Sequence, residues 1–205
     1  GFTLEETFPP FRAAADWCLE VVGQVTPDQW DRPGLGEWSI RELAAHTSRA
    51  FLLVETYLAN NGPIDVVSAA DYFRMAMPDA SVNRAIAERG RDEAVDLGDD
   101  PAAAIAARAT RAVRAVELAP ARAVCVTFAG TLSLADYLAT RVVEVCVHTL
   151  DLADALGLAE AEPPAEAAML SVWVLGALAA EPSPAVLLRA LTGRVPLPQG
   201  FSVFP

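Results

Sequence analysis

Apolar side chains recur every three or four residues through four long segments of the chain, and this spacing constrains the fold most. It is typical of helices that bury one face. Capping residues support it, because Ser39 and Glu42 form a capping box, and Asp100-Pro101 and Ser133 precede two other apolar runs. The pattern predicts helices over residues 4–24, 40–58, 101–118 and 134–156. Four long helices with little strand content predict an all-α protein, a helical bundle.

The remaining segments are shorter and less regular. The β-branched run 123–128 predicts a minor extended or β element, and the C-terminal tail from Arg194 is also expected to be extended. Residues 64–98 are expected to be helical in pieces, with breaks near Pro78, Gly90 and Gly98.

Two proline-initiated helices are expected near the C-terminus, over residues 163–180 and 184–191. We therefore expect residues 1–160 to form the bundle. Residues 161–205 are expected to form a C-terminal helical extension and tail packed on it, within a single structural domain.

Charge and composition exclude several classes of function. The chain has 27 acidic and 15 basic residues, all of the latter arginine, and a net charge of −12, which argues against binding to nucleic acid or to an anionic membrane surface. The apolar run 169–180 is too short for a membrane span, which needs roughly 18 residues. No secretion signal is expected, and three cysteines in apolar surroundings fit a reduced, cytoplasmic protein.

The chain has only two histidines, and one of them lies four residues after an acidic residue. Glu144 and His148 share one face of the predicted helix, with Cβ atoms about 5–6 Å apart, and valines surround them. Side chains so placed can both ligate one metal ion. A Glu–His ion pair or a hydrogen-bonded core histidine explains this segment equally well.

The second histidine, His46, lies on the apolar stripe of the helix 40–58. A lone histidine there is most often a core residue, but two bundle helices could bring His46, Glu144 and His148 together. Two histidines and one glutamate with an open fourth position are the ligands of a catalytic zinc site, and nickel, iron or cobalt could also fit.

Neighbouring residues suggest further roles beside this site. Asp151 could orient the His148 imidazole, or be an ordinary exposed carboxylate. Arg84 could be a substrate clamp, although a surface arginine is the default. Trp38 is expected in the core, and the helical phase of Cys146 indicates buried packing rather than metal ligation.

Four segments resemble the mycothiol-dependent maleylpyruvate isomerase-like family, which belongs to the DinB-like superfamily of metal-binding four-helix bundles. Trp30-Asp31-Arg32-Pro33 and residues 37–46 are similar to its N-terminal signature. Residues 136–157 are similar to its helix with the metal-binding glutamate and histidine. Residues 190–197 are similar to its C-terminal end.

The resemblance implies a DinB-like bundle with a divalent metal, usually zinc, held by His46, Glu144 and His148. It implies mycothiol as co-substrate, bound to the metal as thiolate and adding to a small electrophile. It also implies an actinobacterial source. The isomerase proper carries a second domain, whereas about 48 residues follow Gly157 here, so a transferase acting on another electrophile is expected.

Three functions therefore stay open. The leading one is metal-dependent thiol S-transfer or isomerisation, with a small-molecule thiol and an electrophile as partners. A hydrolase using metal-bound water is the second, and a non-catalytic DinB-like binding protein is the third. A homodimer is compatible with each of them.

Overall fold

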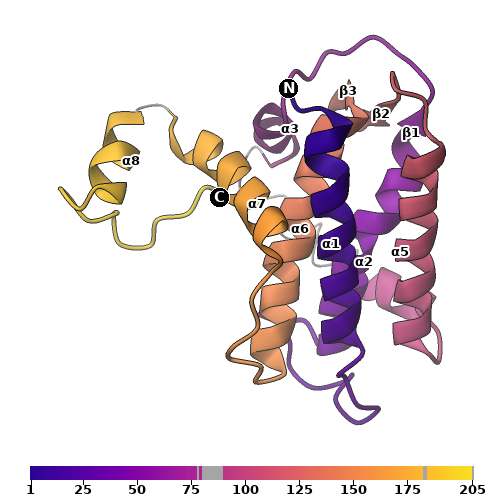
Figure 1. Cartoon of the computed structure of the whole chain (residues 1–205). Helices are drawn as coiled ribbons and strands as arrows, with labels where there is room; N and C mark the ends of the chain where they lie inside the picture. Colours follow the sequence, from indigo (N-terminus) through magenta and orange to yellow (C-terminus); the bar gives the residue numbers. More distant parts are fainter. Residues whose placement is uncertain (78, 80–89, 182–183, 205) are drawn as a thin grey trace.

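A four-helix bundle forms the centre of the computed structural model, which describes residues 1–77, 79, 90–181 and 184–204 (Figure 1). Its helices are α1 (Leu4–Val22), α2 (Ile40–Tyr57), α5 (Pro101–Leu118) and α6 (Leu134–Ala155). Each contacts two others, in the cyclic order α1, α6, α2, α5. The all-α prediction is confirmed, and each bundle helix lies within two residues of its predicted bounds at either end.

Helix α6 is buried on almost every side, because it also contacts two helices outside the bundle. These are α3 (Ala69–Ala76) and α7 (Ala165–Ala179), and α7 packs against α1 as well. Tyr137, Leu138 and Leu152 of α6 are fully buried. The apolar side chains around this helix therefore pack against neighbouring helices on nearly all sides.

Local hydrogen bonds fix where the bundle helices begin. The Ser39 hydroxyl accepts a hydrogen bond from the Glu42 backbone N–H, while the Glu42 carboxylate accepts from the Ser39 backbone N–H at 2.7 Å. Asp100 and Ser133 cap α5 and α6 through their side chains. These contacts satisfy N–H groups that have no partner within the helix.

A three-stranded antiparallel sheet lies at one end of the bundle, close to the N-terminus (Figure 1). Its strands are β1 (Leu58–Ala59), β2 (Val124–Thr127) and β3 (Gly130–Ser133), with β2 in the centre. The extended element predicted at 123–128 is confirmed as β2. The sequence did not indicate β1 or β3, which become strands by pairing with β2.

The segment 64–98 is helical in pieces where the structure describes it, with α3 and a helix over residues 90–96. Pro78 lies outside the described residues. The predicted break at Gly90 is wrong, because this residue is helical. A Cβ atom at Gly90 would lie 3.0 Å from the indole of Trp38, so close packing explains this glycine better than a turn does. Gly98 follows the helix with a φ of +65°.

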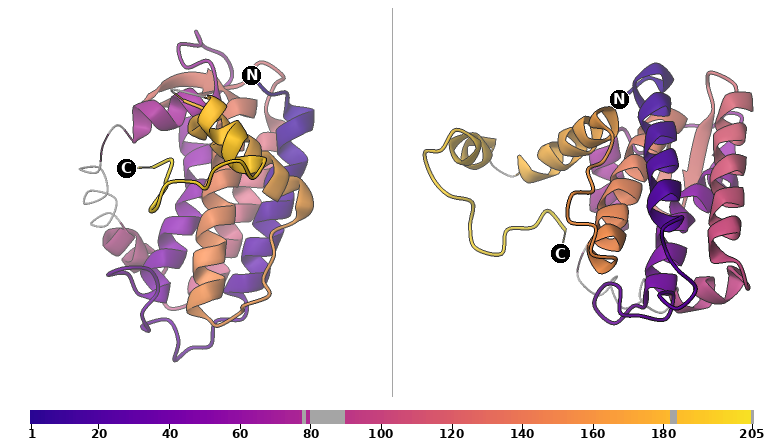
Figure 2. Two further views of the ribbon diagram at one scale, coloured as in Figure 1. Left: turned by 90° about the vertical axis from the view of Figure 1, so that its left-hand side faces the viewer. Right: turned by 60° about the horizontal axis from the view of Figure 1, so that its bottom comes forward.

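The C-terminal region leaves the bundle and then returns to it. Helix α8 (Pro184–Leu191) has no buried residue and stands apart from the other helices in Figure 1 and in the right view of Figure 2. The tail after α8 contains turns and no strand among its described residues. The tail brings the ring centroid of Phe204 to 5.2 Å from the ring centroid of Phe73 in α3.

Among the residues that the structure describes, no helix combines the length and the apolar character that crossing a membrane requires.

Substitution of Ser39 by alanine tests the start of α2. We expect this change to lower the free energy of unfolding by about 1 kcal/mol, because it removes the cap of the helix that carries His46. Thr110→Ala, at an exposed position inside α5, is the control and should change stability by less than about 0.5 kcal/mol. Urea unfolding followed by circular dichroism measures both, and equal stabilities would contradict the capping role.

Candidate metal centre

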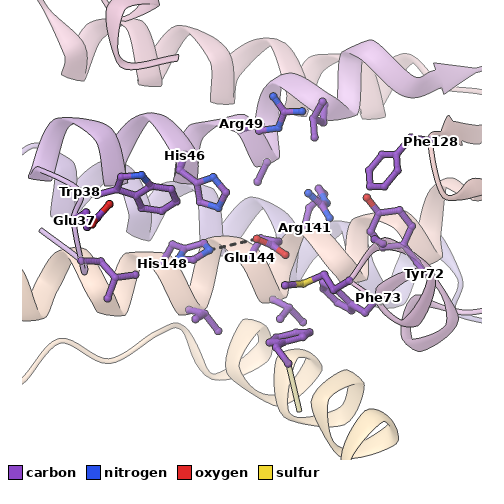
Figure 3. Close-up of a pocket in the computed structure, with 18 residues that line it drawn as sticks. Glu37, Trp38, His46, Arg49, Tyr72, Phe73, Phe128, Arg141, Glu144 and His148 are labelled. Carbon is purple, nitrogen blue, oxygen red and sulfur yellow. Dashed lines mark ion pairs between the residues drawn. The ribbon is translucent and has the colours of Figure 1, made fainter. Parts of the chain in front are cut away.

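Three side chains with metal-ligating atoms meet between α2 and α6. His46 comes from α2, and Glu144 and His148 come from α6, which packs beside it. One ligand atom from each residue lies within 4.8 Å of the others. Figure 3 shows the two imidazoles and the carboxylate facing one another across the space between the helices. A single ion could be held by all three.

The α6 side chains are also aligned by their helical spacing. Nε2 of His148 lies 3.4 Å from a carboxylate oxygen of Glu144, one turn earlier in the helix. Nδ1 of His148 lies 3.0 Å from a carboxylate oxygen of Asp151, three residues later. A carboxylate at Nδ1 fixes the ring orientation and leaves Nε2 directed toward Glu144 and His46.

Aromatic packing holds the second imidazole. The ring centroids of His46 and His148 lie 4.7 Å apart. The ring centroid of Trp38 also lies 4.7 Å from that of His46, on another side. Trp38 is only 8% exposed, so an apolar side chain covers this side of His46. The predicted core position of Trp38 is thus confirmed, and the indole contacts the site as well.

The two imidazoles have opposite pKa shifts. Burial is the main effect on His46 and lowers its pKa to about 3, with further lowering from the neighbouring His148. Burial by itself would also lower the pKa of His148. The hydrogen bonds with Asp151 and Glu144 outweigh it and raise that pKa to about 9. Without a metal ion, His46 is therefore neutral at pH 7 and His148 is protonated.

Glu144 stays ionised at neutral pH. Burial would raise its pKa, but the hydrogen bond with His148 and the positive charge of Arg141 lower it to about 2. The centre thus offers a neutral imidazole, a carboxylate and an imidazole that must lose a proton before it can bind a metal.

A cavity of about 430 Å³ opens beside the three residues, within the size range of small-molecule sites. His46, Glu144 and His148 form one end, with Trp38 and Val147 beside them. The other walls come from distant parts of the sequence. They include Arg49, Leu53, Tyr72, Phe73, Met77, Phe128, Arg141 and Phe204.

Two arginines line this cavity in different ways. Arg49 forms an ion pair with Glu93, so its charge is compensated within the chain. Arg141 lies over the rings of Tyr72 and Tyr137, with its central guanidinium carbon 5.6 Å and 4.8 Å from the two centroids. Figure 3 places Arg141 between the Glu144 carboxylate and the rings of Tyr72 and Phe128.

Other residues considered from the sequence lie elsewhere. Arg84, the candidate substrate clamp, is outside the described residues. Cys146 is buried, does not line the cavity and has a pKa raised by burial. Sequence reasoning assigned no role to Arg141, although it lies one turn before Glu144 on the same helix face. Tyr72 and Phe204 also line the cavity, but nothing in the sequence around them indicates a binding site.

Comparison with known protein families matches residues 11–153 to the family described as the mycothiol maleylpyruvate isomerase N-terminal domain. The chain belongs to this family. The matched region runs from α1 to the end of α6 and includes His46, Glu144 and His148, so the resemblance noted in the sequence is confirmed. Comparison with curated proteins found no match, and comparison with solved structures found none either.

Titration of the two histidines tests the hydrogen bond from Asp151. In the metal-free protein, we expect His148 to titrate near pH 9 and His46 to remain neutral down to acidic pH, as measured by NMR of the ring protons. Asp151→Asn should lower the pKa of His148, because one ionised acceptor is lost. The exposed Asp154, also in α6, provides the control Asp154→Asn. An unchanged His148 pKa in Asp151→Asn would contradict this account.

Proposed function

We propose that this protein is a metal-dependent thiol S-transferase or isomerase that uses mycothiol and a small electrophile. The observation that carries the proposal is the position of His46, Glu144 and His148 at one end of a cavity large enough for small molecules. Membership of the mycothiol maleylpyruvate isomerase N-terminal domain family supports the choice of thiol.

The donor set fits a catalytic metal centre. Two imidazoles and one carboxylate leave room for a further ligand, as catalytic zinc sites do, whereas structural zinc sites close all four positions. We propose zinc as the metal, with nickel as the other candidate. A divalent ion held here would lower the pKa of a coordinated thiol and so supply thiolate at neutral pH.

The residues around the centre have separate tasks in this proposal. Asp151 holds the His148 ring by its Nδ1 atom, so that Nε2 faces the other two donors. Trp38 and Val147 form apolar walls that limit the access of water. Reduced access of water strengthens electrostatic interactions in the cavity and disfavours hydrolysis as a competing reaction.

Metal content tests the three-ligand centre. Protein purified without chelators and without a His tag is expected to contain about one zinc or nickel ion per chain, as measured by mass spectrometry. His46→Ala and Glu144→Gln should each lose most of the metal while retaining the helical fold. Asp154→Asn is the matched control for loss of a carboxylate from α6. Full metal occupancy in His46→Ala would contradict the proposed ligand set.

Dependence on thiol separates the proposed reaction from hydrolysis. We expect the metal-loaded protein to consume an electrophile such as a haloarene only when mycothiol is present. Free cysteine, supplied as the thiol in place of mycothiol, should support little activity. A hydrolase would turn over ester or amide substrates without any thiol. A protein that contains metal yet neither binds mycothiol nor reacts with either class would support a non-catalytic binding role instead.

A further inference from the structure

Arg141 is a buried cation that lines the cavity beside the candidate metal centre. Only 5% of the residue is exposed, and it belongs to α6, one helical turn before Glu144. The chain therefore places a permanent positive charge inside the small-molecule cavity. Such burial is costly unless the charge is paired or hydrogen-bonded.

The protein itself compensates Arg141 incompletely. Its Nε donates a hydrogen bond of 3.0 Å to the hydroxyl of the adjacent Thr140, and the rings of Tyr72 and Tyr137 lie against the guanidinium. No carboxylate of the described part of the chain lies within ion-pair distance of Arg141. Arg49 of the same cavity differs, because it has Glu93.

The terminal nitrogens of Arg141 are thus left for a ligand. A guanidinium has five N–H groups, and Nε uses one of them on Thr140. The remaining four, on the two terminal nitrogens, form no hydrogen bond with any described residue. Beside them, the hydroxyl of Tyr72 points into the same part of the cavity (Figure 3).

The charges of the centre favour an anion at this place. Among the described residues that line the cavity, Glu37 and Glu144 are the carboxylates. Glu37 forms an ion pair with Arg91, and Glu144 lies beside His46 and His148. Once a divalent ion is bound, the positive charges of the ion and of Arg141 exceed the negative charges of Glu144 and Asp151. A ligand with one negative charge near Arg141 would reduce this excess.

We propose that Arg141 and the hydroxyl of Tyr72 form a binding subsite for the carboxylate group of a small organic acid. A carboxylate is planar and accepts two parallel hydrogen bonds from the paired terminal nitrogens of an arginine. The surrounding walls, Leu53, Phe73 and Phe128, offer no further donors, so the subsite suits a single carboxylate better than a phosphate dianion.

The position of the subsite gives the ligand an orientation. Arg141 and Glu144 are three residues apart on one face of α6, which corresponds to about 4.5 Å along the helix axis. A ligand whose carboxylate binds Arg141 extends its other end toward His46 and His148. The assignment of this ligand as the electrophile rests on the proposed thiol transfer. In that reaction, the carbon attacked by the thiolate would lie a few bonds from the carboxylate.

Binding of simple carboxylates tests the subsite without any reaction. The probes are acetate and succinate, with acetamide and succinamide as uncharged controls, measured by calorimetry and by ligand-observed NMR. We expect the carboxylates to bind the zinc-loaded protein and the amides to bind much less. Arg141→Met, which retains an apolar side chain between the tyrosines, should weaken carboxylate binding roughly 10- to 100-fold. Tyr72→Phe should weaken it several-fold.

Arg49→Met is the matched control, because it also removes one positive charge from the cavity lining. A general effect of charge would weaken binding equally in both variants, whereas the subsite predicts a much larger loss at Arg141. Melting temperatures and circular dichroism establish that each variant is folded. Arg141→Lys keeps the charge but not the paired donors, so it covers the case in which the methionine variant does not fold.

The metal-free variant His46→Ala separates this inference from the proposed function. Carboxylate binding that persists in His46→Ala supports the subsite even if no thiol transfer is ever observed. The inference is overturned if wild-type protein binds no carboxylate, or if it binds the amides equally well. It is also overturned if Arg141→Met binds like wild type, as expected if the carboxylate binds the metal alone.

Discussion

The burial of charged groups along one face of α6 is the constraint on which the rest of the structure depends. Arg141, Glu144 and His148 follow one another at spacings of three and four residues, on a helix that is otherwise packed on nearly every side. Each buried charge costs several kcal/mol unless it is paired. Glu144 and Asp151 compensate His148. Arg141 has no carboxylate within ion-pair distance in the described part of the chain, and its charge is stabilised by the Thr140 hydroxyl, two aromatic rings and the nearby charge of Glu144.

The bundle accommodates this face by leaving a cavity beside it. Helix α2 lies against α6 and supplies His46, and Trp38, just before α2, packs against that imidazole. The absence of a side chain at Gly90 allows the indole to lie there. Segments outside the four helices complete the walls: α3, the turn between β2 and β3, and the returning tail. The bundle therefore positions the donors, and the added segments shape the space in front of them.

Most of the secondary structure could be predicted because its causes are local. Apolar spacing and capping residues fix the bundle helices within a few residues, and Ser39 and Ser133 cap the helices that they were expected to cap. β2 was predicted from its β-branched residues. β1 and β3 were not, because Leu58–Ala59 and Gly130–Ser133 are strands only through hydrogen bonds to β2. Gly90 was misinterpreted because its reason is a tertiary contact.

The sequence by itself determined the alignment of Glu144, His148 and Asp151. Helix geometry places residues three and four apart on one face, whatever the helix packs against. Only the tertiary structure decided that His46 joins them and that Trp38 contacts the site. It also decided that Arg141 lies in the cavity with no ion-pair partner among the described carboxylates. Those relations depend on how two helices far apart in the sequence pack and on which side chains fill the space between them. The spacing of residues along one helix contains no information about either.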